Sequence, residues 1–319
     1  MSIAFLNNTI FLLSLGWAIV NSLWQAGFLW VVFKTFNRSS KKSPALFKYT
    51  LSLFFFFLSF AWFIYTLAQN YFYLQINTLN VFDFLGLKKS VLLRQINIAL
   101  PFLSVIYLAV VFKMLGKFCV GYCKVARLKK SSLVKAPVDI RLFTARLAIH
   151  MNLKKLVVVW LSDKVDVPAV IGFVKPVILL PAAIVNQLSI QQMEAVLLHE
   201  MAHIKRNDFL VNLLQSLIEC LLFFNPFSIA LSKAARQQRE NCCDDWIVNH
   251  QYNLHDYAGA LLVLEKNRYQ QLALAMAATN NKKQLLVRIK RLFAAVPQTD
   301  FNVFQILLSE IIFKIRVIF

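Results

Sequence analysis

Three long stretches without a charged side chain constrain the fold of this chain more than any other feature. They cover residues 1–33, 49–69 and 95–112. A helix of about 20 mostly apolar residues is long enough to cross the hydrocarbon core of a bilayer. The sequence therefore predicts three transmembrane spans, at about residues 9–33, 49–69 and 95–112.

The composition agrees with a membrane protein that has the lipid bilayer as a partner. Hydrophobic residues make up 59% of the chain and charged residues only 16%, against about 25% charged in an ordinary soluble domain. The first stretch lacks the basic beginning and small-residue cleavage site of a signal peptide, so we expect it to remain as an anchor.

The basic residues lie mainly beside the apolar stretches. The net charge of +20 would by itself suggest a nucleic-acid partner, but this placement is typical of cytoplasmic loops that face anionic lipid, and we expect no nucleic acid. The positive-inside rule places the N-terminus outside and everything after Lys113 in the cytoplasm. Lys88, Lys89 and Arg94, in the outer loop, run against that rule. The two basic groups are Lys34, Arg38, Lys41, Lys42 and Lys48, then Lys117, Lys124, Arg127, Lys129 and Lys130.

The composition changes after residue 116, which divides the chain into a transmembrane region, residues 1–116, and a cytoplasmic domain, residues 117–300. Residues 156–181 are short β-branched runs broken by proline and glycine, which predicts two or three strands. Residues 301–319 are apolar but contain three charges, so a fourth span and an interfacial helix both remain open.

Residues 208–224 form an apolar helix with one polar stripe. The stripe is compatible with a membrane-associated helix that faces the domain, and equally with a buried core helix. Asn225-Pro226 should end this helix. Later helices are expected near residues 232–248, 257–265 and 282–292.

A metal-binding pattern follows a helix start. Ser189 and Gln192 have the spacing of a capping box, and His199-Glu200-Met201-Ala202-His203 comes one helical stretch later. Positions i and i+4 share a helix face, so both imidazoles can bind one tetrahedral Zn²⁺. Glu200 is offset toward the water and can take its proton as the catalytic base, which is the chemistry of a zincin.

A third ligand should come from a later helix. Glu240 is the best candidate, and Asp244, four residues on, could support a ligating imidazole. The adjacent Cys242 and Cys243 are alternative thiolate ligands. The transition-state stabiliser is unassigned, with Arg236, Arg239 and Tyr257 as weak candidates. An edge strand at residues 169–174 or 177–180 could pair with an extended substrate. The alternative, which the sequence favours, is a strand with a structural role alone.

Several segments resemble one known family. HEMAHIKRNDFLVNLLQSLIECLLFFNP, RQQRENCCDD, GFVKPVILLP, YAGALL and VRIKRLF are similar to the membrane metallopeptidases of the beta-lactam sensor-transducer (BlaR/MecR) type. The resemblance implies an α-helical membrane protein with an α+β, gluzincin-like zincin domain in the cytoplasm of a bacterium, anchored in the inner membrane. It matches His199, His203 and Glu240 to the zinc ligands, Glu200 to the catalytic acid/base and Asp244 to the supporting carboxylate.

The resemblance also implies a function. The expected activity is regulated proteolysis of the protein itself or of a cytoplasmic repressor during transmembrane signalling. The penicillin-binding sensor of antibiotic-responsive members does not carry over, so beta-lactam sensing is not expected. The alternative is a non-catalytic signal transducer with a structural metal site. The sequence leaves a homodimer open.

Overall fold

The computed structural model describes residues 3–40, 43–76, 91–128, 133–250, 252–272 and 279–294. The predicted membrane-associated segment 301–319 lies outside the described residues.

Three of the described helices are long and apolar enough to cross a membrane, as the sequence predicted. Each is longer than its predicted span, because the helix continues from the apolar stretch into its flanks. In α4 a single helix runs through residue 112, the expected end of the third span, and through the expected domain boundary at 116/117. The three helices are α1 (Ile3–Ser39), α2 (Ala45–Ile76) and α4 (Val91–Leu128).

Polar side chains inside this helix bundle form hydrogen bonds with one another. The Gln25 amide donates to the Thr66 hydroxyl at 3.0 Å, and the Trp17 indole N–H donates to the side-chain oxygen Oδ1 of Asn97 at 3.2 Å. A hydrocarbon environment offers no water to such groups, so partners on neighbouring helices are needed. At Gly16 helices α1 and α4 approach so closely that an added Cβ would lie 2.8 Å from the Cβ of Leu100.

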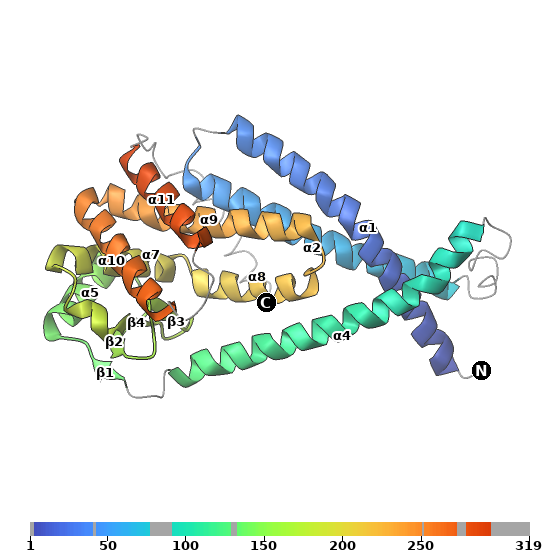
Figure 1. Ribbon diagram of the computed structural model, residues 1–319, viewed down its shortest axis with the longest axis horizontal. Coiled ribbons are helices and arrows are strands. Elements are labelled where there is room, and N and C mark those ends of the chain that lie inside the picture. The colour runs from blue at the N-terminus through green and yellow to red at the C-terminus, as the bar shows by residue number, and fades with distance from the viewer. Residues whose placement is uncertain are drawn as a thin grey trace.

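Two further helices form a hairpin that enters the bundle (Figure 1). Helix α8 (Asp208–Leu221) and helix α9 (Pro226–Asn249) are joined by a short turn. At the tip, the Tyr107 hydroxyl donates to the Leu221 carbonyl at 2.9 Å, and the Asn225 amide donates to the Ser22 carbonyl at 2.9 Å. Ser22 lies near the middle of the apolar part of α1, so the tip sits deep among the span helices.

The remaining elements form a mixed α/β unit at the other end of the molecule (Figure 1). Its four-stranded sheet has the order β1-β2-β4-β3, with β2 and β4 parallel and the other two pairs antiparallel. The predicted strands are present, and the two-residue β1 adds a fourth. The expectation that residues 177–180 could be an edge was wrong, because β4 lies between β2 and β3. The strands are β1 (Val134–Lys135), β2 (Val158–Ser162), β3 (Ala169–Ile171) and β4 (Val177–Pro181).

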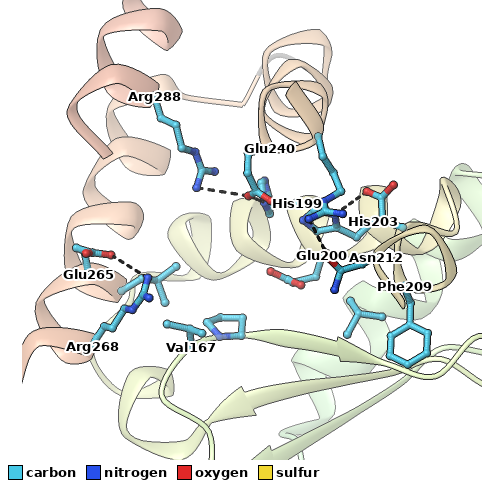
Figure 2. Close-up of a pocket in the computed structure, with 15 residues that line it drawn as sticks. Val167, His199, Glu200, His203, Phe209, Asn212, Glu240, Glu265, Arg268 and Arg288 are labelled. Atoms are coloured by element: carbon cyan, nitrogen blue, oxygen red, sulfur yellow. Dashed lines mark hydrogen bonds and ion pairs between the residues drawn. The ribbon is translucent and has the colours of Figure 1, made fainter. Parts of the chain in front are cut away.

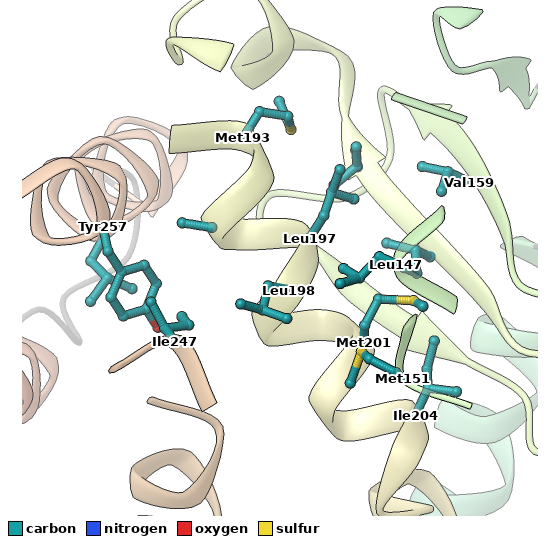
Figure 3. Packing of buried hydrophobic residues seen from close by; sticks show 14 of the residues in the cluster. Leu147, Met151, Val159, Met193, Leu197, Leu198, Met201, Ile204, Ile247 and Tyr257 are labelled. Carbon is teal, nitrogen blue, oxygen red and sulfur yellow. The ribbon is translucent and has the colours of Figure 1, made fainter. Parts of the chain in front are cut away.

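Helix α7 (Ile190–Lys205) is the centre of the core of this unit. The predicted capping box at Ser189 and Gln192 is present and fixes where α7 begins. Figure 3 shows α7 between Val159 of the sheet on one side and Tyr257 on the other. Because α7 is packed on both faces, the motif it carries is held rigidly. The other helices are α5 (Val138–His150), α6 (Ala182–Val185), α10 (Leu254–Leu272) and α11 (Thr279–Phe293).

Candidate metal centre

Helix α7 presents the two motif histidines side by side. His199 and His203 are one turn apart, and their ring centroids are 4.9 Å apart with the rings nearly perpendicular. His199 is 7% exposed and Glu200 is 9% exposed. His199 and Glu200 are therefore almost withdrawn from water, His203 is half-buried, and all three line one cavity.

The Nδ1 atom of His199 is held by a hydrogen-bonded chain. It lies 2.9 Å from the hydroxyl oxygen of Tyr257, and that hydroxyl donates to Oδ1 of Asp244 at 2.8 Å. Because the Tyr257 hydroxyl donates its proton to Asp244, the Tyr257 oxygen accepts a hydrogen bond from the Nδ1–H of His199. This tautomer leaves the Nε2 lone pair as the metal-binding group, the usual arrangement for a ligating histidine.

The Nδ1 atom of His203 is held by a carboxylate. It lies 2.8 Å from Oδ2 of Asp208, whose other oxygen pairs with Arg206 at 3.4 Å. Burial acts to lower the pKa of His203, but Cys243 and Asp208 together raise it well above its usual value. A metal ion would therefore have to displace a proton from this ring, as metal binding to histidine normally does.

Glu240, on α9, approaches the Nε2 atom of His199. Its Oε2 atom is 3.6 Å from Nε2 of His199, close to the separation of about 3.3 Å between two ligands of a tetrahedral zinc ion. Burial acts to raise the pKa of Glu240, but His199, His203 and Arg288 hold it well below its usual value. The carboxylate is thus ionised, as a metal ligand must be.

Cys243 is the other residue close to both histidines. The ligand atoms of His199, His203 and Cys243 lie within 4.8 Å of one another. However, the Cys243 sulfur lies 3.4 Å from Nδ1 of His203, the atom that already faces Asp208. Burial also raises the pKa of this thiol, against the opposing effect of His203. The donor set of two Nε2 atoms and the Glu240 carboxylate therefore fits a zinc ion better.

Cys242 faces away from the centre. It is 5% exposed and packs with Ala45 and Tyr49 at the start of α2. Burial raises its pKa to about 12. A neutral thiol in this place is a packing residue.

The cavity in front of the histidines has a volume of about 400 Å³. Figure 2 shows Glu200 in this cavity beside the two imidazoles, with Val167 on the facing wall. The apolar part of the lining consists of Val167, Pro168, Val170, Phe209 and Leu264. The polar part, besides the three motif residues, consists of Asp208, Asn212, Arg239, Glu240, Glu265, Arg268 and Arg288.

The three weak candidates for a transition-state stabiliser have different surroundings. Arg239 lines the cavity. Tyr257 is fully buried and its hydroxyl faces Nδ1 of His199. Arg236 pairs with Glu219 and is partly exposed. Arg239 alone among these three has access to a molecule in the cavity.

The residues around the centre that sequence reasoning missed are Asp208, Arg288 and the supporting contact of Tyr257. Asp208 follows His203 by five positions, but a sharp turn separates them, with Asn207 in the left-handed region at a φ of 57°. The positive φ of this turn aims Asp208 back at the motif. An N-D pair directly after H-E-x-x-H-x-x-x was the available signal for such a turn.

The chain was also compared with known proteins. The sequence model of the family described as BlaR1 peptidase M56 matches residues 87–292. The chain belongs to this family. The matched range contains every residue of the candidate centre, and the resemblance noted from the sequence is confirmed.

Curated relatives of the family match a shorter segment. The chain is 34% identical over 123 residues to the regulatory protein BlaR1 of Bacillus licheniformis. It is 30% identical over 118 residues to the methicillin resistance mecR1 proteins of Staphylococcus aureus and Staphylococcus epidermidis. These alignments cover 38% and 37% of this chain, and the chain spans 20% of the length of each relative.

Proposed function

We propose that this chain is a membrane-embedded zinc endopeptidase whose α/β unit is a gluzincin-like zincin domain. One observation carries the proposal. Both motif histidines have Nδ1 engaged by a partner, so the Nε2 atoms are left to bind a metal together with the nearby Glu240 carboxylate. Glu200 lines the same cavity.

The residues divide the chemistry among them. Bound zinc would polarise the peptide carbonyl and lower the pKa of a nearby water. His199, His203 and Glu240 would hold the ion. Glu200 takes the proton of the attacking water and passes it to the leaving amine. Arg239 is placed to stabilise negative charge that develops on the carbonyl oxygen.

The sheet suggests how a peptide would be held. Strand β3 is an edge of the sheet, and Val170 of this strand lines the cavity together with Val167 and Pro168. An extended peptide could pair with this edge through its backbone, whatever its sequence. The apolar residues of the wall favour an apolar side chain next to the cleaved bond.

The proposed substrate is the protein itself or a cytoplasmic regulatory protein such as a repressor. The proposed topology is that of a multi-pass protein of the bacterial inner membrane, with the N-terminus outside and the zinc domain in the cytoplasm. Its support is the excess of basic residues beside the spans, membership of a peptidase family and similarity to a protein described as regulatory.

The test is substitution of Glu200 by glutamine in detergent-purified protein that carries a tag at each end. We expect Glu200→Gln to keep about one zinc per chain and to lose cleavage of itself and of a peptide library by about 10²- to 10⁴-fold. Glu194→Gln, on the same helix, is the matched control and should cleave normally. Cleavage by Glu200→Gln at the wild-type rate would refute the peptidase. Wild type that holds zinc but cleaves nothing would favour the non-catalytic transducer with a structural metal site.

A further inference from the structure

Two arginines of α11 bind two neighbouring carboxylates of α9. Arg288 donates from Nε to Oδ2 of Asp244 at 3.0 Å and from Nη2 to Oδ1 at 2.7 Å. Arg291, one turn later, pairs with Asp245 and donates to the Asn241 carbonyl. Helix α11 is therefore attached to α9 directly behind the candidate metal centre.

Asp244 connects Arg288 to the first histidine. The Oδ1 atom that Arg288 contacts also accepts the Tyr257 hydroxyl, and Arg288 donates to the Tyr257 oxygen at 3.2 Å. That oxygen in turn holds Nδ1 of His199. Asp244 is fully buried, so without the guanidinium its negative charge would lose this partner. The hydrogen bonds from Asp244 through Tyr257 to His199 would then be disrupted.

Arg288 also reaches the third proposed ligand. Its Nη1 atom lies 3.7 Å from Oε2 of Glu240. Figure 2 shows the ion pair between the two side chains as a dashed line. Only 17% of the Arg288 side chain is exposed, so this attraction is weakly screened. One guanidinium thus orients His199 through Asp244 and Tyr257, and orients Glu240 by direct contact.

We propose that Arg288 is a positioning residue of the metal centre and that its contacts with Asp244 and Glu240 set the affinity for zinc. The proposal rests on the proposed function, because it takes His199 and Glu240 as zinc ligands. The planar fork of arginine matches both oxygens of Asp244, and the point charge of lysine cannot reproduce this geometry. Helix α11, at the end of the range that matches the family, would then hold the metal site in its binding arrangement.

The test measures zinc affinity by competition with a chromophoric chelator in full-length, detergent-purified protein. All variants carry Glu200→Gln, so self-cleavage cannot alter the sample. We expect Arg288→Gln to raise the zinc Kd by about 10- to 100-fold, the usual cost of losing a residue that orients a ligand. Arg288→Lys should be similarly impaired. Arg291→Gln, the matched control on the same helix, should stay within about threefold of the parent. Among the residues that the structure describes, Arg291 bonds to Asp245 and Asn241 rather than to the chain that leads to His199.

The outcomes separate the two proposals. Parental zinc affinity in Arg288→Gln, or its full recovery in Arg288→Lys, would overturn the role of Arg288 while leaving the peptidase intact. A parent that binds no zinc would overturn the proposed function itself. If Arg288→Gln does not fold, Tyr257→Phe takes its place, because it removes the hydroxyl link to His199 and keeps the Arg288–Asp244 pair. Unchanged affinity in Tyr257→Phe would then refute the proposal.

Discussion

Glu240 and Cys243 are three positions apart on α9, and both approach the motif histidines. They approach different atoms, however. Glu240 lies near Nε2 of His199 and lines the cavity, whereas Cys243 lies near Nδ1 of His203 and is fully buried. The Glu240 carboxylate therefore lies beside the His199 atom that is left for a metal, while the Cys243 thiol lies beside the His203 atom that already faces Asp208.

This difference predicts which substitution removes the metal. Cys243→Ala should retain about one zinc per chain, whereas Glu240→Ala should lose most of it, because one of three protein ligands is gone. Elemental analysis of both proteins after gel filtration in chelator-free buffer checks this. Loss of zinc in Cys243→Ala with retention in Glu240→Ala would assign the third ligand to the thiol.

At this scale, sequence reasoning names the candidate ligands and Asp244, but not the contacts of Tyr257 and Arg288 that connect them. The grouping of His199, Glu200 and His203 can be predicted from the sequence, because their spacing on one helix fixes the face that they share. Tyr257 is 58 positions from His199, and Arg288 is 44 positions from Asp244. Helical periodicity describes the faces of one element, and carries no information on which element will pack against that face.

At the scale of elements, the α8–α9 hairpin joins the membrane helices to the metal centre. Ile218 of α8 and Leu231 of α9 belong to the same buried cluster as Phe56 of α2, while the far end of α9 carries Glu240. The apolar pattern of residues 208–224 was compatible with a membrane-associated helix and with a core helix. Ile218 and Leu221 of α8 pack on the span helices, and Gln215 of its polar stripe turns inward to Ser232 of α9. Leu210, Leu214 and Leu217 stay exposed.

Asn225 at the tip of this hairpin should be needed for its stability. Its side-chain oxygen accepts from the backbone N–H groups of Phe227 and Ser228, while its amide donates to Ser22 of α1. Asn225→Ala removes the cap of α9 and the contact with α1. We expect a loss of about 1–2 kcal/mol, visible as a lower melting temperature by circular dichroism in detergent.

Asn249 provides the matched control for this substitution. It is exposed at the opposite end of α9, so Asn249→Ala should leave the melting temperature unchanged. An equal loss in the two variants would mean that the tip of the hairpin contributes nothing special to stability.

The elements that the sequence predicted best are those defined by local chemistry. The three span helices, the strands of residues 156–181 and the start of α7 follow from apolar length, β-branched runs and a capping pair. The order of the strands was not predictable in the same way. Strand β4 lies between β2 and β3 because of long-range pairing, and this pairing makes β3 the edge beside the cavity.

At the scale of the whole molecule, α4 is too long for the membrane alone. Its 38 residues extend over about 57 Å at 1.5 Å per residue, while the hydrocarbon core is about 30 Å thick. The apolar part lies toward its beginning, and Lys113, Lys117, Lys124 and Arg127 follow toward its end. The last turns of α4 therefore extend from the membrane toward the α/β unit, on the side where basic residues gather.

This arrangement makes the orientation of the protein measurable with its own cysteines. Cys119 and Cys123 are exposed on the end of α4, whereas Cys220, Cys242 and Cys243 are buried. With the α/β unit in the cytoplasm, a membrane-impermeant maleimide should label the protein in inverted membrane vesicles and spare it in intact cells. Replacing both exposed cysteines by serine should abolish the labelling.

An engineered cysteine on the opposite side completes the measurement. Ile76, at the end of α2, is 79% exposed and lies one membrane crossing away from Lys48. In the variant that lacks Cys119 and Cys123, Ile76→Cys should be labelled in intact cells, because two crossings place it on the same face as the N-terminus. If Cys119 were labelled from outside and Ile76→Cys from inside, the orientation in the membrane would be the opposite of the proposed one. It would also exclude a cytoplasmic substrate, because the cavity beside Glu200 would then face away from the cytoplasm.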